Sequence, residues 1–167
     1  KGKVYCWGRH NFDFENKTKG PYSMSFFKDI TITQVHSLYD NFLALSNQGI
    51  LYFWGPSCPI PNEIENPLSV AISLGNIRLA KGMFKHHSID GKMKLGETPL
   101  IRTVIERNES LLLYLLKNNA SITETSNEDN TAMKVVLHNF YIRILLLILK
   151  YRPFTIHQIS DDRKSLL

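Results

Sequence analysis

Apolar positions follow two different periods along the chain, and the period changes near residue 65. Three short runs rich in β-branched and aromatic residues, 30–36, 41–46 and 50–54, predict β-strands. Only residues 47–49 (Asn-Gln-Gly) separate the last two runs, which predicts a three-residue hairpin link ending in glycine. We therefore expect an antiparallel sheet in the first part of the chain.

Helical spacing takes over in the remainder of the chain. Three inner helices are expected over 68–74, 100–107 and 133–139, and each is followed by a second, outer helix. The outer helices show apolar residues three and four positions apart, which gives each of them one apolar face. These residues are Leu79, Met83 and Phe84, then Leu111, Leu112, Leu115 and Leu116, then Ile144, Leu145, Ile148 and Leu149.

The three helix pairs begin with similar residues. Their openings are Asn-Pro-Leu at 66–68, Thr-Pro-Leu at 98–100 and Thr-Ala-Met at 131–133. Each opening therefore follows the previous one after about 33 residues. A Thr or Asn followed by Pro predicts an N-cap with proline at the first helical position. Asn119, which follows the middle outer helix, is expected to adopt a left-handed cap conformation.

A repeated segment ending in Trp-Gly marks the first part of the chain. It reads Gly-Lys-Val-Tyr-Cys-Trp-Gly over 2–8 and Gly-Ile-Leu-Tyr-Phe-Trp-Gly over 49–55. The two tryptophans are thus about 47 residues apart, which suits one four-stranded propeller blade. Residues 1–55 resemble the regulator of chromosome condensation repeat, whose blades end in Gly-x-Val-Tyr-x-Trp-Gly. The aromatic residues of the motif could stack on a ligand, but we expect them to pack in the blade: Tyr5, Trp7, Tyr52 and Trp54.

The helical part, over residues 66–154, resembles the ankyrin repeat, whose period is about 33 residues. Both resemblances together imply an α+β multidomain chain, in which one antiparallel propeller blade precedes an ankyrin solenoid of about three repeats. We expect the blade at 1–55, a proline-rich linker at 56–65, and ankyrin repeats with a C-terminal extension at 66–167. Repeats are expected to start near residues 66, 98 and 131.

The last predicted outer helix is apolar nearly all round. A terminal repeat normally shows water a polar face, so Leu146 and Leu147 are expected to be covered. An incomplete fourth repeat over 154–167, or another domain or chain, would supply the cover. The chain begins at Lys1 and not at Met, and we expect it to be a segment of a longer protein.

The charge is unevenly distributed. The formal net charge is +5; residues 1–65 balance six basic against six acidic side chains, whereas 66–167 hold fourteen against nine. This modest excess favours an acidic protein partner and argues against a nucleic acid. Two isolated cysteines, Cys6 and Cys58, indicate reduced thiols in an intracellular protein of the cytoplasm or nucleus. The longest apolar run, 144–149, is too short to span a membrane.

Motifs for catalysis are missing from the sequence. It contains no glycine-rich phosphate loop, zinc-protease helix, nucleophile elbow or paired-cysteine metal site. His86 and His87 are adjacent, and adjacent helical side chains point about 100° apart, so the pair cannot chelate one ion alone. We therefore expect a protein that is not an enzyme and holds no cofactor or metal.

The connections between helix pairs are the candidate binding surface. With the inner helices, such connections line a concave, partner-binding face in ankyrin stacks. Opposite charges on the segments 88–97 and 121–130 could orient a partner, although ordinary solvated loops would look the same. The candidate residues are Lys81, Lys85, Lys92, Lys94, Glu124, Glu128 and Asp129.

The resemblances imply a non-catalytic scaffold for protein–protein interaction that uses the ankyrin concave face and the propeller surface. Two alternatives remain open. The propeller could exchange guanine nucleotide on a small GTPase or bind chromatin, or the chain could recruit substrates to a ubiquitin ligase.

Overall fold

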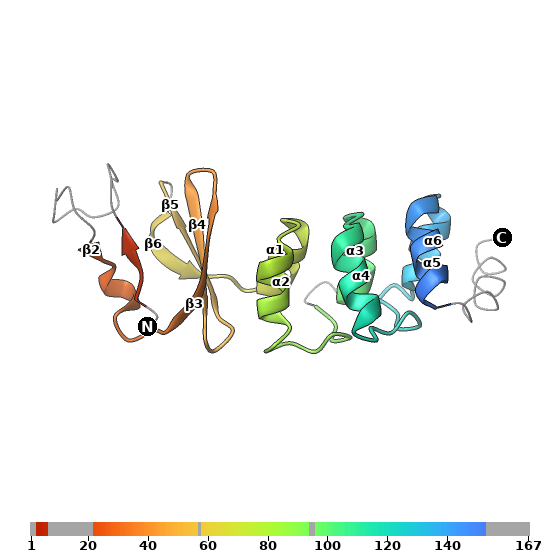
Figure 1. Cartoon of the computed structure of the whole chain (residues 1–167), viewed down its shortest axis with the longest axis horizontal. Coiled ribbons are helices and arrows are strands. Elements are labelled where there is room, and N and C mark those ends of the chain that lie inside the picture. Colours follow the sequence, from red (N-terminus) through yellow and green to blue (C-terminus); the bar gives the residue numbers. More distant parts are fainter. Residues whose placement is uncertain (1–2, 7–21, 57, 94–95, 153–167) are drawn as a thin grey trace. The chain divides into compact units, whose positions relative to one another are not determined.

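The computed structural model describes residues 3–6, 22–56, 58–93 and 96–152 (Figure 1). The chain divides into two compact units, Lys1–Pro67 and Leu68–Leu167. The first unit contains the strands and the second contains the helices.

A four-stranded antiparallel sheet forms the centre of the first unit. Its strands are β3 (Ile32–Leu38), β4 (Asn41–Ser46), β5 (Leu51–Gly55) and β6 (Cys58–Glu63), and they are hydrogen-bonded in chain order. The three predicted strands and the hairpin between β4 and β5 are confirmed. Gly49 takes a φ of 86° in that hairpin, a conformation that glycine adopts without a steric penalty.

The fourth strand corrects the prediction of a linker at 56–65. Strand β6 pairs with β5 even though it contains Pro59 and Pro61. Proline lacks an N–H donor, but an edge strand needs donors on one side only, and β6 is an edge strand. A register irregularity between Phe53 and Gly55 further relaxes the pairing in this region.

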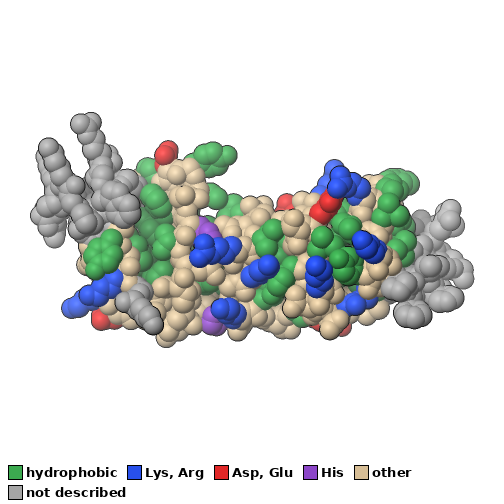
Figure 2. Space-filling view, in the orientation of Figure 1, with side chains coloured by type: hydrophobic (Ala, Val, Ile, Leu, Met, Phe, Trp, Pro, Cys, Tyr) green, Lys and Arg blue, Asp and Glu red, His purple; other side chains and the backbone are tan. Residues whose placement is uncertain are grey.

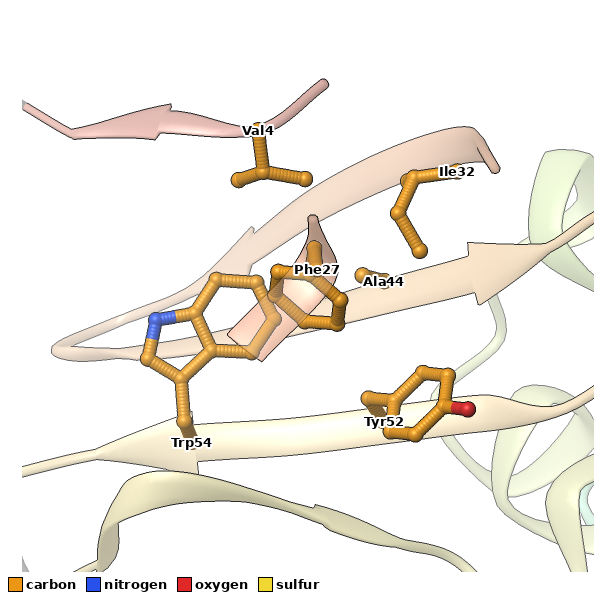
Figure 3. Packing of buried hydrophobic residues seen from close by; sticks show 6 residues of the cluster. All are labelled: Val4, Phe27, Ile32, Ala44, Tyr52 and Trp54. Atoms are coloured by element: carbon orange, nitrogen blue, oxygen red, sulfur yellow. The ribbon is translucent and has the colours of Figure 1, made fainter. Parts of the chain in front are cut away.

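The beginning of the chain packs on this sheet. Two-residue strands β1 (Tyr5–Cys6) and β2 (Tyr22–Ser23) pair with each other, and the short 3-10 helix η1 (Ser25–Phe27) follows. The core that they cover is apolar and aromatic (Figure 3). It consists of Val4, Phe27, Ile32, Ala44, Tyr52 and Trp54.

The predicted packing role of the aromatic motif is confirmed for two of its four residues. Trp54 is only 1% exposed, and its ring centroid lies 5.5 Å from that of Phe27. Tyr52 is also buried and contacts the same phenyl ring edge-on at 5.4 Å. Tyr5 is half-exposed, so it does not belong to this core. Trp7 lies outside the described residues.

Three helix pairs make up the second unit (Figure 1). The pairs are α1 (Pro67–Ser73) with α2 (Ile77–Met83), α3 (Pro99–Ile105) with α4 (Glu109–Lys117), and α5 (Ala132–His138) with α6 (Ile142–Tyr151). Helix α3 contacts α5, and α4 contacts α6.

Local capping explains where α3 and α5 begin and where α4 ends. The hydroxyls of Thr98 and Thr131 accept hydrogen bonds from backbone N–H groups three residues later, which confirms both as N-caps. Asn119 has a φ of 61°, so its predicted left-handed conformation is confirmed as well.

A tight left-handed turn joins the two helices of each pair. Gly75, Arg107 and Phe140 occupy it with φ values of 63°, 54° and 54°. In the first two pairs an asparagine follows and caps the outer helix; Asn76 and Asn108 each accept a hydrogen bond of 3.0 Å from the helix backbone. The same left-handed turn therefore recurs in all three pairs with different residues.

The middle outer helix buries its apolar face completely. The four leucines predicted for the middle outer helix, at 111, 112, 115 and 116, are all fully buried. Polar contacts join the outer helices at their ends. Arg143 forms an ion pair with Glu109 at 2.9 Å, and Arg152 donates to the Leu116 carbonyl at 3.2 Å.

The predicted fold class is wrong. The described residues form one four-stranded antiparallel sheet, a two-stranded ribbon and six α-helices, and they do not show a propeller blade followed by a three-repeat ankyrin solenoid. The start of the chain, expected to supply part of a blade, pairs in a separate ribbon, while the expected linker supplies the fourth strand. Between the helix pairs, the described connections contain turns and one isolated bridge, Thr125 with Thr131, in place of paired hairpin strands.

Of the two leucines of α6 that were expected to be covered, only one is partly shielded from solvent. Leu147 is half-buried, whereas Leu146 is 61% exposed. The segment 154–167, expected to fold back on this helix, lies outside the described residues.

Candidate partner-binding surface

The two connections between helix pairs contain the same turn. In the first, the N–H of Met93 donates to the carbonyl of Glu97 at 2.8 Å, and in the second Ser126 donates to Asn130 at 2.9 Å. The residue before the end of each turn is left-handed: Gly96 has a φ of 81° and Asp129 a φ of 55°. These two positions are as far apart in the sequence as the caps at 98 and 131, so the turns recur in step with the helix pairs.

The two connections contact each other directly. The N–H of Ser121 donates a 2.7 Å hydrogen bond to a carboxylate oxygen of Asp90. Nearby, the side chain of Asn127 lies so close to Gly96 that a Cβ added to this glycine would overlap it. Each contact joins residues about one repeat apart, so the connections form one continuous surface.

Four of the predicted binding residues lie exposed on this surface. Lys92 is on the first connection, and Glu124, Glu128 and Asp129 are on the second. The carbonyl of Asp129 accepts a 3.4 Å hydrogen bond from Lys134 Nζ, which links the second turn to α5. We call these four charged side chains the connection surface.

The remaining predicted residues are placed elsewhere. Lys81 belongs to α2, where its Nζ lies 4.9 Å from the centroid of the Tyr114 ring. Lys85 is exposed just after the end of the same helix. The outer helices therefore position both of these lysines, and the connections do not. Lys94 lies outside the described residues.

A polar network that the sequence did not indicate fixes the end of the first connection. The guanidinium of Arg102 lies 3.4 Å from a carboxylate oxygen of Glu97 and 2.9 Å from one of Glu106, and it donates to Ser73 Oγ at 3.0 Å. This joins the connection to α3 and α1. The four-residue spacing of Arg102 and Glu106 was the one sequence signal available for it.

The adjacent histidines give the start of the first connection a pH-sensitive group. Burial lowers the pKa of His87, and the neighbouring His86 lowers that pKa further. The imidazole of His87 is therefore neutral near pH 7.

Across the part of the chain that the structure describes, no three His, Cys, Asp or Glu residues are grouped so that they could hold a metal ion.

No helix within the described ranges has both the length and the apolar character needed to cross a membrane. No known protein-family model matches the sequence, and no curated protein gives a significant match.

Proposed function

We propose that this chain is a non-catalytic protein-binding module, and that the connection surface is where its partner binds. The observation that carries the proposal is the direct contact between the two connections. The hydrogen bond from Ser121 to Asp90 and the packing of Asn127 on Gly96 hold described residues of the two connections against each other. Lys92 and the three acidic residues stay exposed on that ordered backbone.

Order of this kind favours binding for an energetic reason. A partner that docks on a flexible loop must offset the entropy lost when the loop becomes fixed, whereas an ordered loop loses less. Here, hydrogen bonds inside the second turn add to the order, because Ser126 Oγ accepts from the N–H groups of Glu128 and Asn130.

The charges of the connection surface would set the orientation of the partner. One connection presents Lys92, and its neighbour presents Glu124, Glu128 and Asp129. A partner with the complementary arrangement would be attracted in one orientation and repelled in the reverse one. Three alternative functions stay predictions: nucleotide exchange on a small GTPase, chromatin binding, and recruitment of substrates to a ubiquitin ligase.

The same proposal assigns the protein to the cytoplasm or nucleus. Isolated cysteines such as Cys6 and Cys58 are typical of proteins in reducing compartments. A protein-binding role through charged side chains is compatible with either location.

A charge swap tests the proposal. The variant Lys92→Glu/Glu128→Lys removes the charge difference between the two connections, since the named side chains of each then carry a net charge of −1, and it leaves the net charge of the chain at +5. Its matched control, Lys28→Glu/Asp29→Lys, makes the same exchange at two exposed residues of the first unit. Both variants and the unaltered chain are used to capture proteins from cells, with quantitative mass spectrometry as the readout.

We expect proteins enriched by the unaltered chain to be enriched equally by the control and lost from the swap variant. Circular dichroism should show both variants folded, because all four altered side chains are exposed. Equal enrichment by the swap variant and the control would refute the connection surface as the binding site.

A further inference from the structure

Three lysines occupy matching positions at the ends of the outer helices. Lys85, Lys117 and Lys150 repeat at the same spacing as residues 66, 98 and 131, where the helix pairs open. Each comes nine residues after the residue that precedes its outer helix, at 76, 108 and 141. We call these three side chains the lysine row.

Contacts between neighbouring outer helices place these ends side by side. Phe84, at the end of α2, lies 5.9 Å from Tyr114 of α4 between ring centroids. Arg152, at the end of α6, donates to the carbonyl of Leu116 and to the side chain of Asn119 at the end of α4. The outer helices therefore run parallel, with their C-terminal ends aligned.

The lysine row is exposed, and no described residue neutralises its charge. All three lysines are exposed, and the described residues supply no ion-pair partner to any of them. Three acidic side chains of this unit form ion pairs with arginines: Glu97 and Glu106 pair with Arg102, and Glu109 pairs with Arg143 at the opposite ends of α4 and α6. In the face that Figure 2 shows, Lys and Arg side chains recur over the helical unit, and acidic side chains are few.

A further cation strengthens the positive potential of this end. Lys81 lies over the Tyr114 ring one turn before Lys85. A lysine in the last turn of a helix also interacts favourably with the helix dipole. That interaction leaves the ammonium group accessible, so it does not compete with an incoming anion.

The spacing of the row indicates how a ligand could span it. Packed helices lie about 8–10 Å apart, and an extended peptide advances about 3.3 Å per residue. One step along the row therefore corresponds to about three residues of an extended chain. Phosphates along one strand of a duplex advance by about 3.4 Å each and fit the same step, so it is the modest net charge of +5 that favours an acidic peptide over a nucleic acid.

We infer that the lysine row binds an extended acidic peptide segment with a carboxylate at every third residue. The segment would span about seven residues from Lys85 to Lys150. This inference rests on the proposed protein-binding role and adds a second contact region with a partner of stated chemistry.

Synthetic peptides test the inference on the intact chain. The probe is a fluorescent peptide about seven residues long with glutamates at its first, fourth and seventh positions. A second peptide of identical composition has its three glutamates adjacent, and a single-stranded oligonucleotide of similar length provides the third arm. Fluorescence anisotropy measures the dissociation constant of each.

The expected result is that the spaced peptide binds at least about fivefold more tightly than the clustered one and the oligonucleotide. The variant Lys85→Gln/Lys117→Gln/Lys150→Gln should weaken the spaced peptide about tenfold or more. The control Lys3→Gln/Lys28→Gln/Arg78→Gln removes the same charge from exposed sites elsewhere and should leave its binding unchanged.

Three outcomes would overturn the inference: equal affinity for both peptides, tighter binding of the oligonucleotide, or equal loss in the two triple variants. Absence of peptide binding would overturn it as well. The proposed function has an independent readout, because the swap of Lys92 and Glu128 leaves the lysine row intact. If the swap variant no longer captures a partner and the intact chain does not bind the peptide, the lysine row is refuted and the proposed function is supported.

Discussion

Replacing Gly96 with alanine should destabilise the helical unit through two separate effects. The first is conformational: the residue has a φ of 81°, where a side chain clashes with its own backbone at a cost of about 1–2 kcal/mol. The second is steric, because the new methyl group would overlap the side chain of Asn127 on the next connection. Forcing an extra methyl into a packed site costs about 1–3 kcal/mol. We expect a total loss of about 2–5 kcal/mol.

A double-mutant cycle separates these two effects. Asn127→Gly alone should cost less than about 0.5 kcal/mol beyond its effect on chain entropy, because this side chain is exposed. Combined with Gly96→Ala, it should recover about 1–3 kcal/mol by removing the overlap, while the conformational cost remains. Urea denaturation followed by circular dichroism gives the free energy of unfolding for all four proteins.

The changes in unfolding free energy of the two single variants could add up to that of the double variant within about 0.3 kcal/mol. That result would show that the two connections do not touch at this point. A cost below about 0.5 kcal/mol for Gly96→Ala alone would show that the residue is not held in a left-handed conformation. The first result would remove one of the two contacts between the connections and leave the hydrogen bond of Ser121 to Asp90, and the second would remove the turn conformation at Gly96.

Three further predictions concern single side chains. Leu115→Ala should cost about 2–5 kcal/mol in urea denaturation, because a fully buried leucine leaves a cavity, whereas Lys92→Glu should cost less than about 0.5 kcal/mol; equal losses would contradict the packing. Asn108→Ala should lower the melting temperature through loss of about 1 kcal/mol of capping, and an unchanged melt would mean the cap is not formed. Because the pKa of His87 is lowered in the folded protein, the unfolded chain binds the proton first as the pH falls through 6.5, and stability should decrease toward acid. His87→Gln should reduce that decrease in pH-dependent thermal melts, and an unchanged slope would contradict it.

The local part of the fold could be read from the sequence. The Thr98 and Thr131 caps depend on a hydroxyl and the next few residues, so the sequence contains nearly all the information they need. The hairpin ending at Gly49 is equally local. Strand β6 was missed for a tertiary reason: proline is excluded from central strands, and only the assembled sheet shows that Pro59 and Pro61 lie at an edge.

The candidate site was predictable in composition but not in arrangement. Exposure of Lys92 and of the acidic residues followed from their polarity and loop position. Contact between the connections, by contrast, depends on how one helix pair packs on the next, and nothing near Gly96 in the sequence refers to Asn127. The lysine row could have been found by applying the spacing of the helix openings to Lys85, which leads to Lys117 and onward.

Hydrogen–deuterium exchange of the full chain, with and without a purified partner, tests the central claim most directly. The partner is any protein that the unaltered chain captures and the Lys92→Glu/Glu128→Lys variant does not. The account predicts slower exchange on binding in the connections, at residues 88–93 and 121–130, because the partner covers their exposed backbone. Slower exchange confined to the sheet, at residues 32–63, with the connections unchanged would contradict it.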